Sequence, residues 1–264
     1  MHDSAVDFKQ RAIEQWTADP CGPEASGAAD LLRARRAYAP FMAGALDYEG
    51  ARGLEVLDLG CGQGIDLCEY ALAGARVTGV DLTPRHVELA RRHLAELGLQ
   101  GTVVEGDAEQ LPFPDSAFDR VSSNGVLHHT PDMPQALAEM FRVLRPGGGA
   151  TIIVYNRNSG YYWLELVLRY GILQGQLLRE RTMANVLSAN VERSSIGARP
   201  LVRVYRRKTL RSLLHAAGFA DVTVAPSAFK PDDTTLTRYL PRRLQAALSS
   251  LPGGWYLVAR GTRT

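Results

Sequence analysis

A short apolar run that ends in alternating glycines constrains this chain more than any other feature. Residues 56–66 read VLDLGCGQGID, with Gly60, Gly62 and Gly64 between the apolar run and residues with helical spacing. An apolar run of this length, which begins just after Gly53, is typical of a strand buried on both faces of a parallel sheet. Glycines between such a strand and a helix let the backbone approach a ligand closely. The segment therefore predicts a strand–turn–helix unit that binds a nucleotide-like ligand.

Two acidic residues narrow the choice of ligand. The G-x-G-x-G spacing differs from the G-x-G-x-x-G fingerprint of dinucleotide-binding proteins. Asp58 lies two residues before Gly60, where a carboxylate would repel a pyrophosphate and would suit an ammonium group. Asp81 ends the next predicted strand, where an acidic side chain can accept both hydroxyls of a ribose. We therefore expect a ligand that contains a ribose and tolerates a nearby negative charge.

Strands and helices alternate through the middle of the chain, which predicts a parallel, doubly wound sheet. The predicted strands lie near 55–59, 76–80, 102–105, 118–123 and 149–155. The predicted helices lie near 64–73, 84–97 and 132–144.

The two ends of the chain add to this unit. Helical spacing at 4–18 and 28–50 predicts an N-terminal helical cap over residues 1–50, before a domain of residues 51–264. Residues 156–200 break the alternation and predict an inserted lid. An amphipathic helix at 208–219 precedes strands at 221–225 and 254–261, which we expect to form a terminal antiparallel hairpin. The expected fold is α/β and Rossmann-like, with seven mostly parallel strands.

Five motifs in order carry a resemblance to a known family. They are DLGCGQG, VDLT, GDAEQLPF, FDRVSSNGVLHH and VLRPGGGATIIV. The chain resembles the class I S-adenosylmethionine-dependent methyltransferases, and within them the small-molecule branch that includes quinone-biosynthesis enzymes. The resemblance covers residues 54–155 well and 201–225 loosely. It implies an enzyme that uses S-adenosyl-L-methionine as its cofactor.

The resemblance also implies roles for residues at the strand ends. The residues implied to bind the cofactor are Asp58, Gly60, Cys61, Gly62, Asp81, Leu82, Asp107, Ala108 and Asn124. Asp81 would accept the ribose hydroxyls, Leu82 would pack on the adenine, and Asp107 would accept from its amino group. Two of these acidic residues could instead have a purely structural role. Asp58 could cap the glycine turn, and Asp107 could be a turn residue after Gly106.

Catalytic and acceptor-binding residues are less constrained by the motifs. His129 is the candidate general base, although it and His128 could instead hold their loop by hydrogen bonds. Tyr155, Trp163 and Tyr170 are candidates for contact with the acceptor. The stretch YYWLELVLRYGIL places Trp163, Tyr170 and three aliphatic residues on one predicted apolar stripe, which could also serve only to pack the helix.

Composition excludes several other classes of protein. The net charge of +2 implies no general attraction to nucleic acid or to an anionic membrane. Cys21, Cys61 and Cys68 show neither a disulfide framework nor a metal-ligand spacing, so we expect no metal and a reducing cytoplasm. The first ten residues lack a secretory apolar segment, and no apolar run reaches the roughly 20 residues that span a bilayer.

The predicted activity is methyl transfer to a partly apolar small molecule of specialised or quinone-like metabolism. The alternatives are a nucleic-acid methyltransferase, a nicotinamide-dependent oxidoreductase and a non-catalytic cofactor-binding module. Eight arginines could form a basic face for nucleic acid, at positions 179, 181, 193, 199, 203, 206, 207 and 211, although glutamates interleave with them. The sequence names neither the acceptor nor the atom that is methylated, and it leaves a homodimer open.

Overall fold

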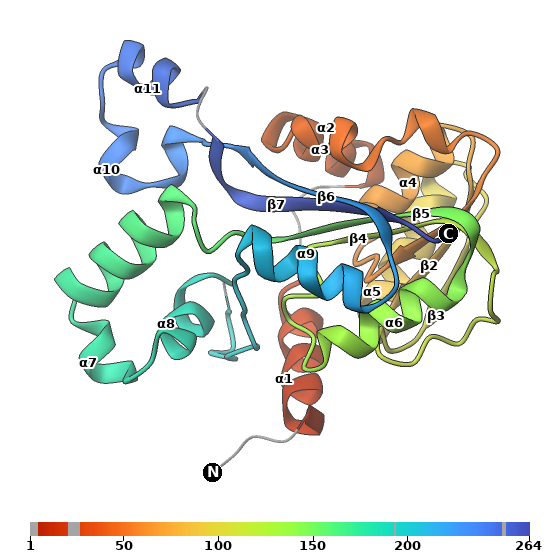
Figure 1. The fold of residues 1–264 in the computed structure, drawn as a ribbon, viewed down its shortest axis with the longest axis horizontal. Coiled ribbons are helices and arrows are strands. Elements are labelled where there is room, and N and C mark those ends of the chain that lie inside the picture. The colour runs from red at the N-terminus through yellow and green to blue at the C-terminus, as the bar shows by residue number, and fades with distance from the viewer. Residues whose placement is uncertain (1–4, 21–26, 193, 250–251) are drawn as a thin grey trace.

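A seven-stranded mixed sheet forms the centre of the protein (Figure 1). The computed structural model describes residues 5–20, 27–192, 194–249 and 252–264, so Cys21 and Arg193 lie outside the described residues. The strand order is β3-β2-β1-β4-β5-β7-β6. The strands are β1 (Glu55–Leu59), β2 (Arg76–Asp81), β3 (Thr102–Glu105), β4 (Phe118–Asn124), β5 (Leu144–Tyr155), β6 (Ala220–Ala228) and β7 (Pro252–Thr262).

The pairing confirms the predicted fold class. Strands β1 to β5 pair in parallel, whereas β7 runs antiparallel to both β5 and β6. The strand order reverses between β1 and β4, which is the switch point where open α/β sheets bind ligands beyond their carboxyl ends.

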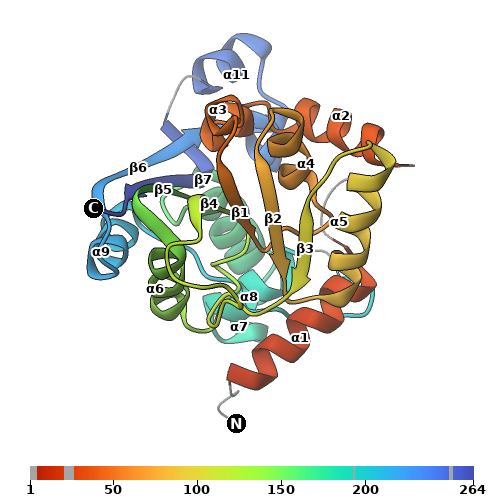
Figure 2. The ribbon, with the colours of Figure 1, turned by 90° about the vertical axis from the view of Figure 1, so that its right-hand side faces the viewer.

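Helices cover both faces of the sheet. On one face lie α2 (Ala28–Tyr38), α3 (Phe41–Leu46), a 3₁₀ turn (Glu49–Ala51), α4 (Ile65–Leu72) and α5 (Pro84–Glu96). On the other lie α6 (Met133–Val143) and α9 (Arg207–Ala216). Figures 1 and 2 show α2, α3 and α4 on the opposite side of the sheet from α6 and α9. Leu31, Leu32 and Leu46 of the N-terminal helices are buried in the same core as β1 and α4.

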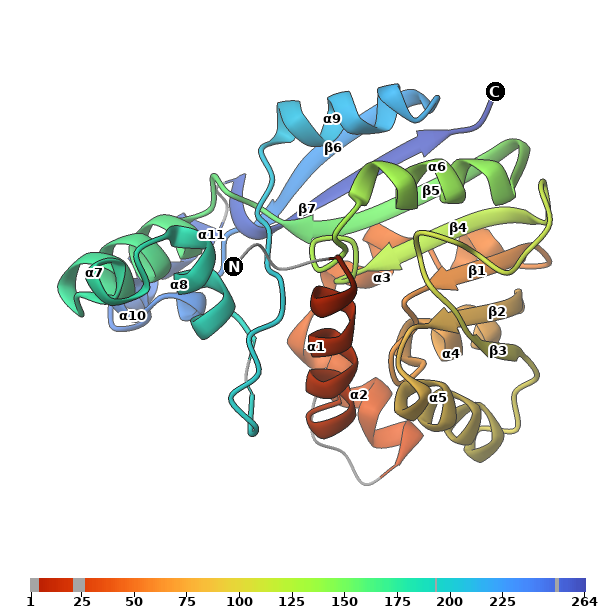
Figure 3. The same ribbon diagram turned by 90° about the horizontal axis from the view of Figure 1, so that it is seen from below.

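The first helix and the segment after β5 extend beyond the carboxyl ends of the strands. Helix α1 (Ala5–Ala18) lies between the sheet and the inserted helices, as Figure 3 shows. The insertion contains a π-helix η2 (Tyr161–Leu173), α7 (Gln176–Glu180) and α8 (Met183–Asn190). Between β6 and β7 lie a 3₁₀ turn (Pro231–Asp233), α10 (Thr235–Arg238) and α11 (Arg242–Ser249).

Two details differ from the sequence-based expectation. Strand β5 begins at Leu144 rather than near 149, because Leu144 pairs with Phe118 across an irregularity in the register.

The prediction that residues 161–173 present one apolar stripe is wrong, because the residues of that stripe are not buried on one face. Leu166 is fully buried, but Trp163 is 51% exposed and Leu173 is 71% exposed. The segment is a π-helix with i→i+5 hydrogen bonds, so its side chains do not follow the 3.6-residue period.

No helix among the described residues is both long enough and apolar enough to span a membrane.

Candidate active site

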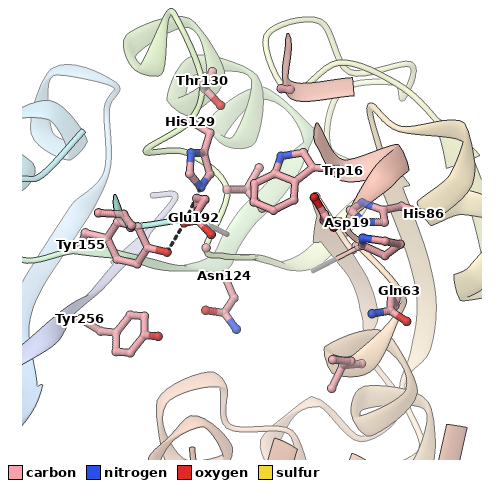
Figure 4. Close-up of a pocket in the computed structure, with 18 of the residues that line it drawn as sticks. Trp16, Asp19, Gln63, His86, Asn124, His129, Thr130, Tyr155, Glu192 and Tyr256 are labelled. Atoms are coloured by element: carbon pink, nitrogen blue, oxygen red, sulfur yellow. Dashed lines mark hydrogen bonds and ion pairs between the residues drawn. The ribbon is translucent and has the colours of Figure 1, made fainter. Parts of the chain in front are cut away.

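A cavity of about 1600 Å³ opens at the carboxyl ends of the parallel strands. Its wall combines the glycine turn, the ends of β2, β4 and β5, helix α1 and the insertion. Figure 4 shows labelled side chains of these segments pointing toward a common space. The sheet switch point and the inserted helices together therefore enclose one site.

The glycine turn after β1 has a backbone that other residues would strain. Gly60, Gly62 and Gly64 have φ angles of 72°, 53° and 81°. A Cβ on Gly60 would lie 2.3 Å from a methyl group of Val126, so a side chain there would have to displace a neighbouring loop. The Gly60 amide donates to the Val80 carbonyl at 2.7 Å, which fixes the turn against β2. These glycines are therefore required by local geometry as well as by any ligand.

Asp81 joins β2 to the glycine turn. One carboxylate oxygen accepts from the Gly62 amide at 2.8 Å, and the other accepts from the Thr83 amide at 2.9 Å. His86, which is 3% exposed, places Nδ1 3.2 Å from the same carboxylate. A carboxylate has about four acceptor positions, so further hydroxyl donors can still bind it. Sequence reasoning missed His86, which follows Asp81 by five residues in the first turn of α5.

Asp58 lies behind the turn and is not among the cavity-lining residues. Ser122 on β4 donates to its carboxylate at 3.3 Å. Burial, with the nearby Asp66 carboxylate, raises the pKa of Asp58 well above its usual value.

Asp66 does line the cavity and binds several donors, including the Tyr48 hydroxyl at 2.7 Å and the Asn124 amide at 2.8 Å. Arg35 from α2 also reaches Asp66, with 3.2 Å between Nη2 and the carboxylate. Neither Arg35 nor Asp66 was among the predicted residues, because neither follows a strand directly.

Asp107 holds a turn and an ion pair. Its Oδ1 accepts from the Glu109 amide at 2.9 Å, and its Oδ2 lies 2.6 Å from Lys9 Nζ. Lys9 also pairs with Glu109. Although partial burial opposes it, these two carboxylates raise the pKa of Lys9. The N-terminal helix is thereby fixed across one end of the cavity.

A polar cluster joins the loop after β4 to the insertion. His129 Nδ1 lies 2.6 Å from the Leu201 carbonyl, and its Nε2 lies 3.4 Å from Glu192 Oε1. The Tyr155 hydroxyl donates to the same oxygen at 2.6 Å. Figure 4 shows His129, Glu192 and Tyr155 on one wall, joined by dashed lines. Although burial opposes it, His129 and Tyr155 lower the pKa of Glu192.

His128 lies behind this wall and is fully buried. Its ring centroid lies 3.8 Å from that of Tyr155 and 4.2 Å from that of His129. Among the described residues, neither of its ring nitrogens has a hydrogen-bond partner. Burial lowers the pKa of His128 well below its usual value, so the ring is neutral near pH 7.

Aromatic rings form the wall opposite the glycine turn. Tyr155 stacks on Trp255 with 4.4 Å between ring centroids, and Tyr161 packs on the same indole at 4.8 Å. Tyr170 of η2 and Tyr256 of β7 also line the cavity. Trp163 is not among the lining residues.

The structure brings most of the predicted site residues together in this one cavity. The lining includes Gly60, Cys61, Gly62, Asp81, Leu82, Asp107, Ala108, Asn124, His129, Tyr155 and Tyr170. Their individual roles stay predictions. Besides Asp66 and His86, the missed contributors include Lys9, Trp16, Arg35 and Glu192, which come from segments with no recognised motif.

Several arginines of the suggested basic face have internal partners. Arg199 pairs with Glu180, Arg203 donates to the Pro131 carbonyl at 2.8 Å, and Arg207 donates to the Val224 carbonyl at 3.1 Å. These three guanidinium groups therefore hold segments of the protein together, which gives them a role that does not involve nucleic acid.

Comparison with known proteins agrees with the geometry. A family model described as a methyltransferase domain matches residues 57–152. An uncharacterized protein of transposon TN4556 from Streptomyces fradiae is 36% identical over 197 residues, covering 73% of this chain and 50% of that protein. A ubiquinone biosynthesis O-methyltransferase from Aromatoleum aromaticum is 38% identical over 114 residues, covering 43% of this chain and 49% of that enzyme. The chain thus spans about half the length of these curated relatives.

Solved structures share the fold. An S-adenosylmethionine-dependent methyltransferase from Mesorhizobium loti superposes with a TM-score of 0.55 at 21% identity, covering 84% of this chain and 97% of that one. The ordered motifs, the strand order, the site at the switch point and the matching family model agree with one another. This chain belongs to the class I S-adenosylmethionine-dependent methyltransferases, with the ubiquinone-biosynthesis O-methyltransferases as distant relatives.

Proposed function

We propose that this protein transfers a methyl group from S-adenosyl-L-methionine to a partly apolar small molecule. One observation carries the proposal: a single cavity has the glycine turn, Asp81 and Asp107 along one side and a group of aromatic rings along the other. The cofactor would occupy the first side, and the acceptor would lie against the rings.

The residues of the first side fit the chemistry of the cofactor. Asp81 can accept hydroxyl hydrogen bonds while it keeps the Gly62 and Thr83 amides. Asp107 lies at the end of the cavity suited to an adenine amino group, and Leu82 offers an apolar surface to the ring. Arg35 brings a positive charge to the wall near Asn124, where an amino-acid carboxylate would meet it.

The size of the cavity supports an acceptor of substantial size. Ligand pockets commonly measure about 300–1000 Å³, whereas this cavity measures about 1600 Å³. The space therefore suffices for a cofactor and a second molecule together. Tyr155 and Tyr161 pack on Trp255 there, and these rings favour an apolar or aromatic partner.

The chain's own contribution to the reaction is positioning and the exclusion of water. The bound cofactor supplies an electrophilic methyl group on a sulfonium. Asn124 and His129 line the cavity next to Tyr155 of the aromatic side, and these three residues would orient the acceptor's nucleophilic atom. The O-methyltransferases among the relatives favour an oxygen as that atom, and beside the aromatic side of the cavity we propose a hydroxyl oxygen.

Two measurements test the proposal. Calorimetric titration should show saturable binding of S-adenosyl-L-methionine and of its demethylated product, with no comparable binding of NADH. Transfer of a labelled methyl group should occur with a panel of hydrophobic phenols and not with total RNA. Methylation of RNA alone would favour the nucleic-acid alternative, and cofactor binding without any transfer would favour a binding module.

His129→Ala separates a role at the acceptor from a role at the cofactor. We expect turnover to fall while the affinity for S-adenosyl-L-methionine stays within about twofold of the parent. Full turnover in this variant would return His129 to a structural role in its loop.

A further inference from the structure

The side chains of His128, His129 and Glu192 lie close enough together to share one bound cation. One nitrogen or oxygen atom from each residue lies within 4.8 Å of those from the other two. Two imidazoles and a carboxylate are a donor set that proteins use for divalent first-row transition metals. One of these imidazoles, that of His128, is fully buried.

The orientation of His129 leaves its Nε2 facing a carboxylate. Nδ1 lies 2.6 Å from the Leu201 carbonyl, so Nδ1 carries a hydrogen and donates it there. In the neutral imidazole this assignment leaves a lone pair on Nε2, directed at Glu192 Oε1. A lone pair and a carboxylate oxygen repel each other unless a cation lies between them. That cation is either a proton on Nε2 or a metal ion.

The separation favours the metal ion. His129 Nε2 and Glu192 Oε1 are 3.4 Å apart. A charge-assisted N–H···O hydrogen bond is shorter, at about 2.7–2.9 Å. Two ligands of a tetrahedral zinc ion, each bound at about 2.0–2.2 Å, lie about 3.4 Å apart. The observed distance therefore matches an edge of the tetrahedron better than it matches a charge-assisted hydrogen bond.

His128 supplies an independent observation. It is fully buried, and within the part of the chain that the structure describes neither of its ring nitrogens has a hydrogen-bond partner. Leaving such a group without a partner carries the full desolvation penalty, so native structures rarely tolerate it. A metal ion bound between His128 and its two neighbours would satisfy one nitrogen, after a side-chain rotation that closes the widest of the three separations by about 1.5 Å.

The supporting contacts are also those of a metal centre. Metal-binding histidines commonly donate their second nitrogen to a backbone carbonyl, as His129 does to Leu201, and binding carboxylates accept a further hydrogen bond, as Glu192 does from Tyr155. His129, Glu192 and Tyr155 line the cavity, so a fourth position on the ion would face its interior.

We propose that His128, His129 and Glu192 form a three-ligand site for a divalent transition-metal ion of the zinc type, with its open position toward the cavity. The sequence alone predicted no metal here, because Glu192 lies far from the two histidines in the chain. The site ties the loop after β4 to the insertion through one ion. Where the reaction is methyl transfer to a hydroxyl, as proposed above, the open position would bind and polarise that hydroxyl.

Metal binding is tested without reference to activity. The full chain is freed of metal with a chelator and titrated with Zn²⁺ by calorimetry, and Co²⁺ is added to a second sample for its absorption spectrum. We expect one equivalent of Zn²⁺ to bind tightly and Co²⁺ to give the intense visible bands of a tetrahedral site. Glu192→Gln and His129→Gln should each weaken Zn²⁺ binding by more than about 100-fold, since even indirect supporting residues contribute 10–100-fold.

His215→Ala is the matched control, because His215 is exposed on α9 and contacts the Phe219 carbonyl instead of this cluster. It should bind Zn²⁺ as the parent does. The parent chain's failure to bind one equivalent of Zn²⁺, or equal binding by all three variants, would overturn the metal site. Nitrogen NMR that shows His129 doubly protonated and unchanged by Zn²⁺ would assign the cluster to an ion pair. A failure here leaves the titration with S-adenosyl-L-methionine unaffected, so the two proposals are distinguishable.

Discussion

Lys9 and Asp107 form an ion pair with 2.6 Å between Nζ and Oδ2, although 98 residues separate them in the chain. The pair anchors the first helix to the turn after β3. It also occupies one oxygen of the carboxylate that we expect to accept from the adenine amino group. Lys9 and the cofactor would therefore share one acceptor.

The first prediction concerns this competition. Lys9→Met should strengthen binding of S-adenosyl-L-methionine by up to about fivefold, since partly exposed ion pairs contribute about 0.2–1 kcal/mol. Arg11→Met removes a positive charge from the same helix without touching Asp107, and it should leave the affinity unchanged. Calorimetric titration of the three proteins decides the matter. Weaker binding by Lys9→Met would show instead that the lysine helps to hold the bound cofactor.

The second prediction concerns Asp81. Asp81→Asn keeps the size of the side chain and removes its charge, so binding of S-adenosyl-L-methionine should weaken about tenfold to a hundredfold. Glu88→Gln makes the same chemical change at an exposed position of α5 and should bind as the parent does. Thermal melting must accompany the titration, because Asp81 also holds the Gly62 and Thr83 amides. An unaltered affinity in folded Asp81→Asn would remove this residue from the cofactor site.

The third prediction concerns the stability cost of burying Asp58. Burial beside Asp66 raises its folded-state pKa, so the unfolded chain loses this proton first as the pH rises. The stability from this site is therefore fully present below pH 3.8 and is lost as the pH rises through the folded-state pKa. Asp58→Asn should raise the melting temperature at pH 7.5, by about 2–4 °C for each kcal/mol recovered.

Asp119→Asn is a control for which we expect the opposite change in melting temperature. Although partial burial opposes it, the Arg145 guanidinium and the Glu55 amide lower the pKa of Asp119. Its contribution to stability is present above its unfolded-state pKa and is lost as the pH falls through the folded-state value. This variant should therefore melt lower than the parent at pH 7.5. Calorimetric melting at several pH values compares both, and a lower melting temperature for Asp58→Asn would contradict the prediction.

The fourth prediction separates two buried thiols. Burial raises the pKa of Cys68 to about 12, so its reactive thiolate is scarce at pH 8. Cys61 is also buried but lines the cavity. Iodoacetamide at pH 8 should leave Cys68 unmodified in the folded protein, and S-adenosyl-L-methionine should slow modification of Cys61. Peptide mass mapping measures both sites, with guanidinium-unfolded protein as the positive control. Rapid native labelling of Cys68 would refute its assignment as an inert core residue.

The fifth prediction uses two aromatic residues of one helix. Tyr170 lines the cavity, whereas Trp163 is 51% exposed and does not. Tyr170→Ala should raise the acceptor KM by about tenfold, since an aromatic ring buries 150–250 Å² and only part of that area would face the acceptor. Trp163→Ala should leave KM and turnover unchanged. The opposite ranking of the two variants would place the acceptor on the outer side of η2.

The sheet could be predicted because each strand carries its own local signal. Strand β1 ends directly before Gly60 and strand β2 ends at Asp81, as the sequence predicted, and both residues are among those that we propose to bind the cofactor. Strand β5 was predicted too short because its first residues pair only through the register irregularity at Phe118. That pairing is a tertiary contact, and no local pattern encodes it.

The site residues also fall into those that a local pattern predicts and those that only tertiary contacts position. Residues that follow a strand directly, such as Asp107 and Asn124, reach the cavity because the carboxyl ends of parallel strands share one edge. Lys9 lies in the N-terminal helix α1, and Glu192 lies in the insertion after β5. Contacts with distant parts of the chain place both residues at the cavity, so no local pattern predicts them. The exposure of Trp163 was missed for a different reason, since the sequence pattern assumed an α-helix and the chain forms a π-helix.

The two ends of the insertion after β5 meet at the same place in the sheet. The Tyr205 amide donates to the Tyr155 carbonyl at 2.8 Å, and the Arg157 amide donates to the Tyr205 carbonyl at 2.9 Å. A segment that leaves and returns at one point adds little loop-closure entropy as its length changes. Recombination could therefore exchange residues 158–203 for a different sequence without altering a single strand pairing. The wall that we propose to hold the acceptor can thus be replaced as an interchangeable cassette, while the sheet that carries the glycine turn keeps its structure.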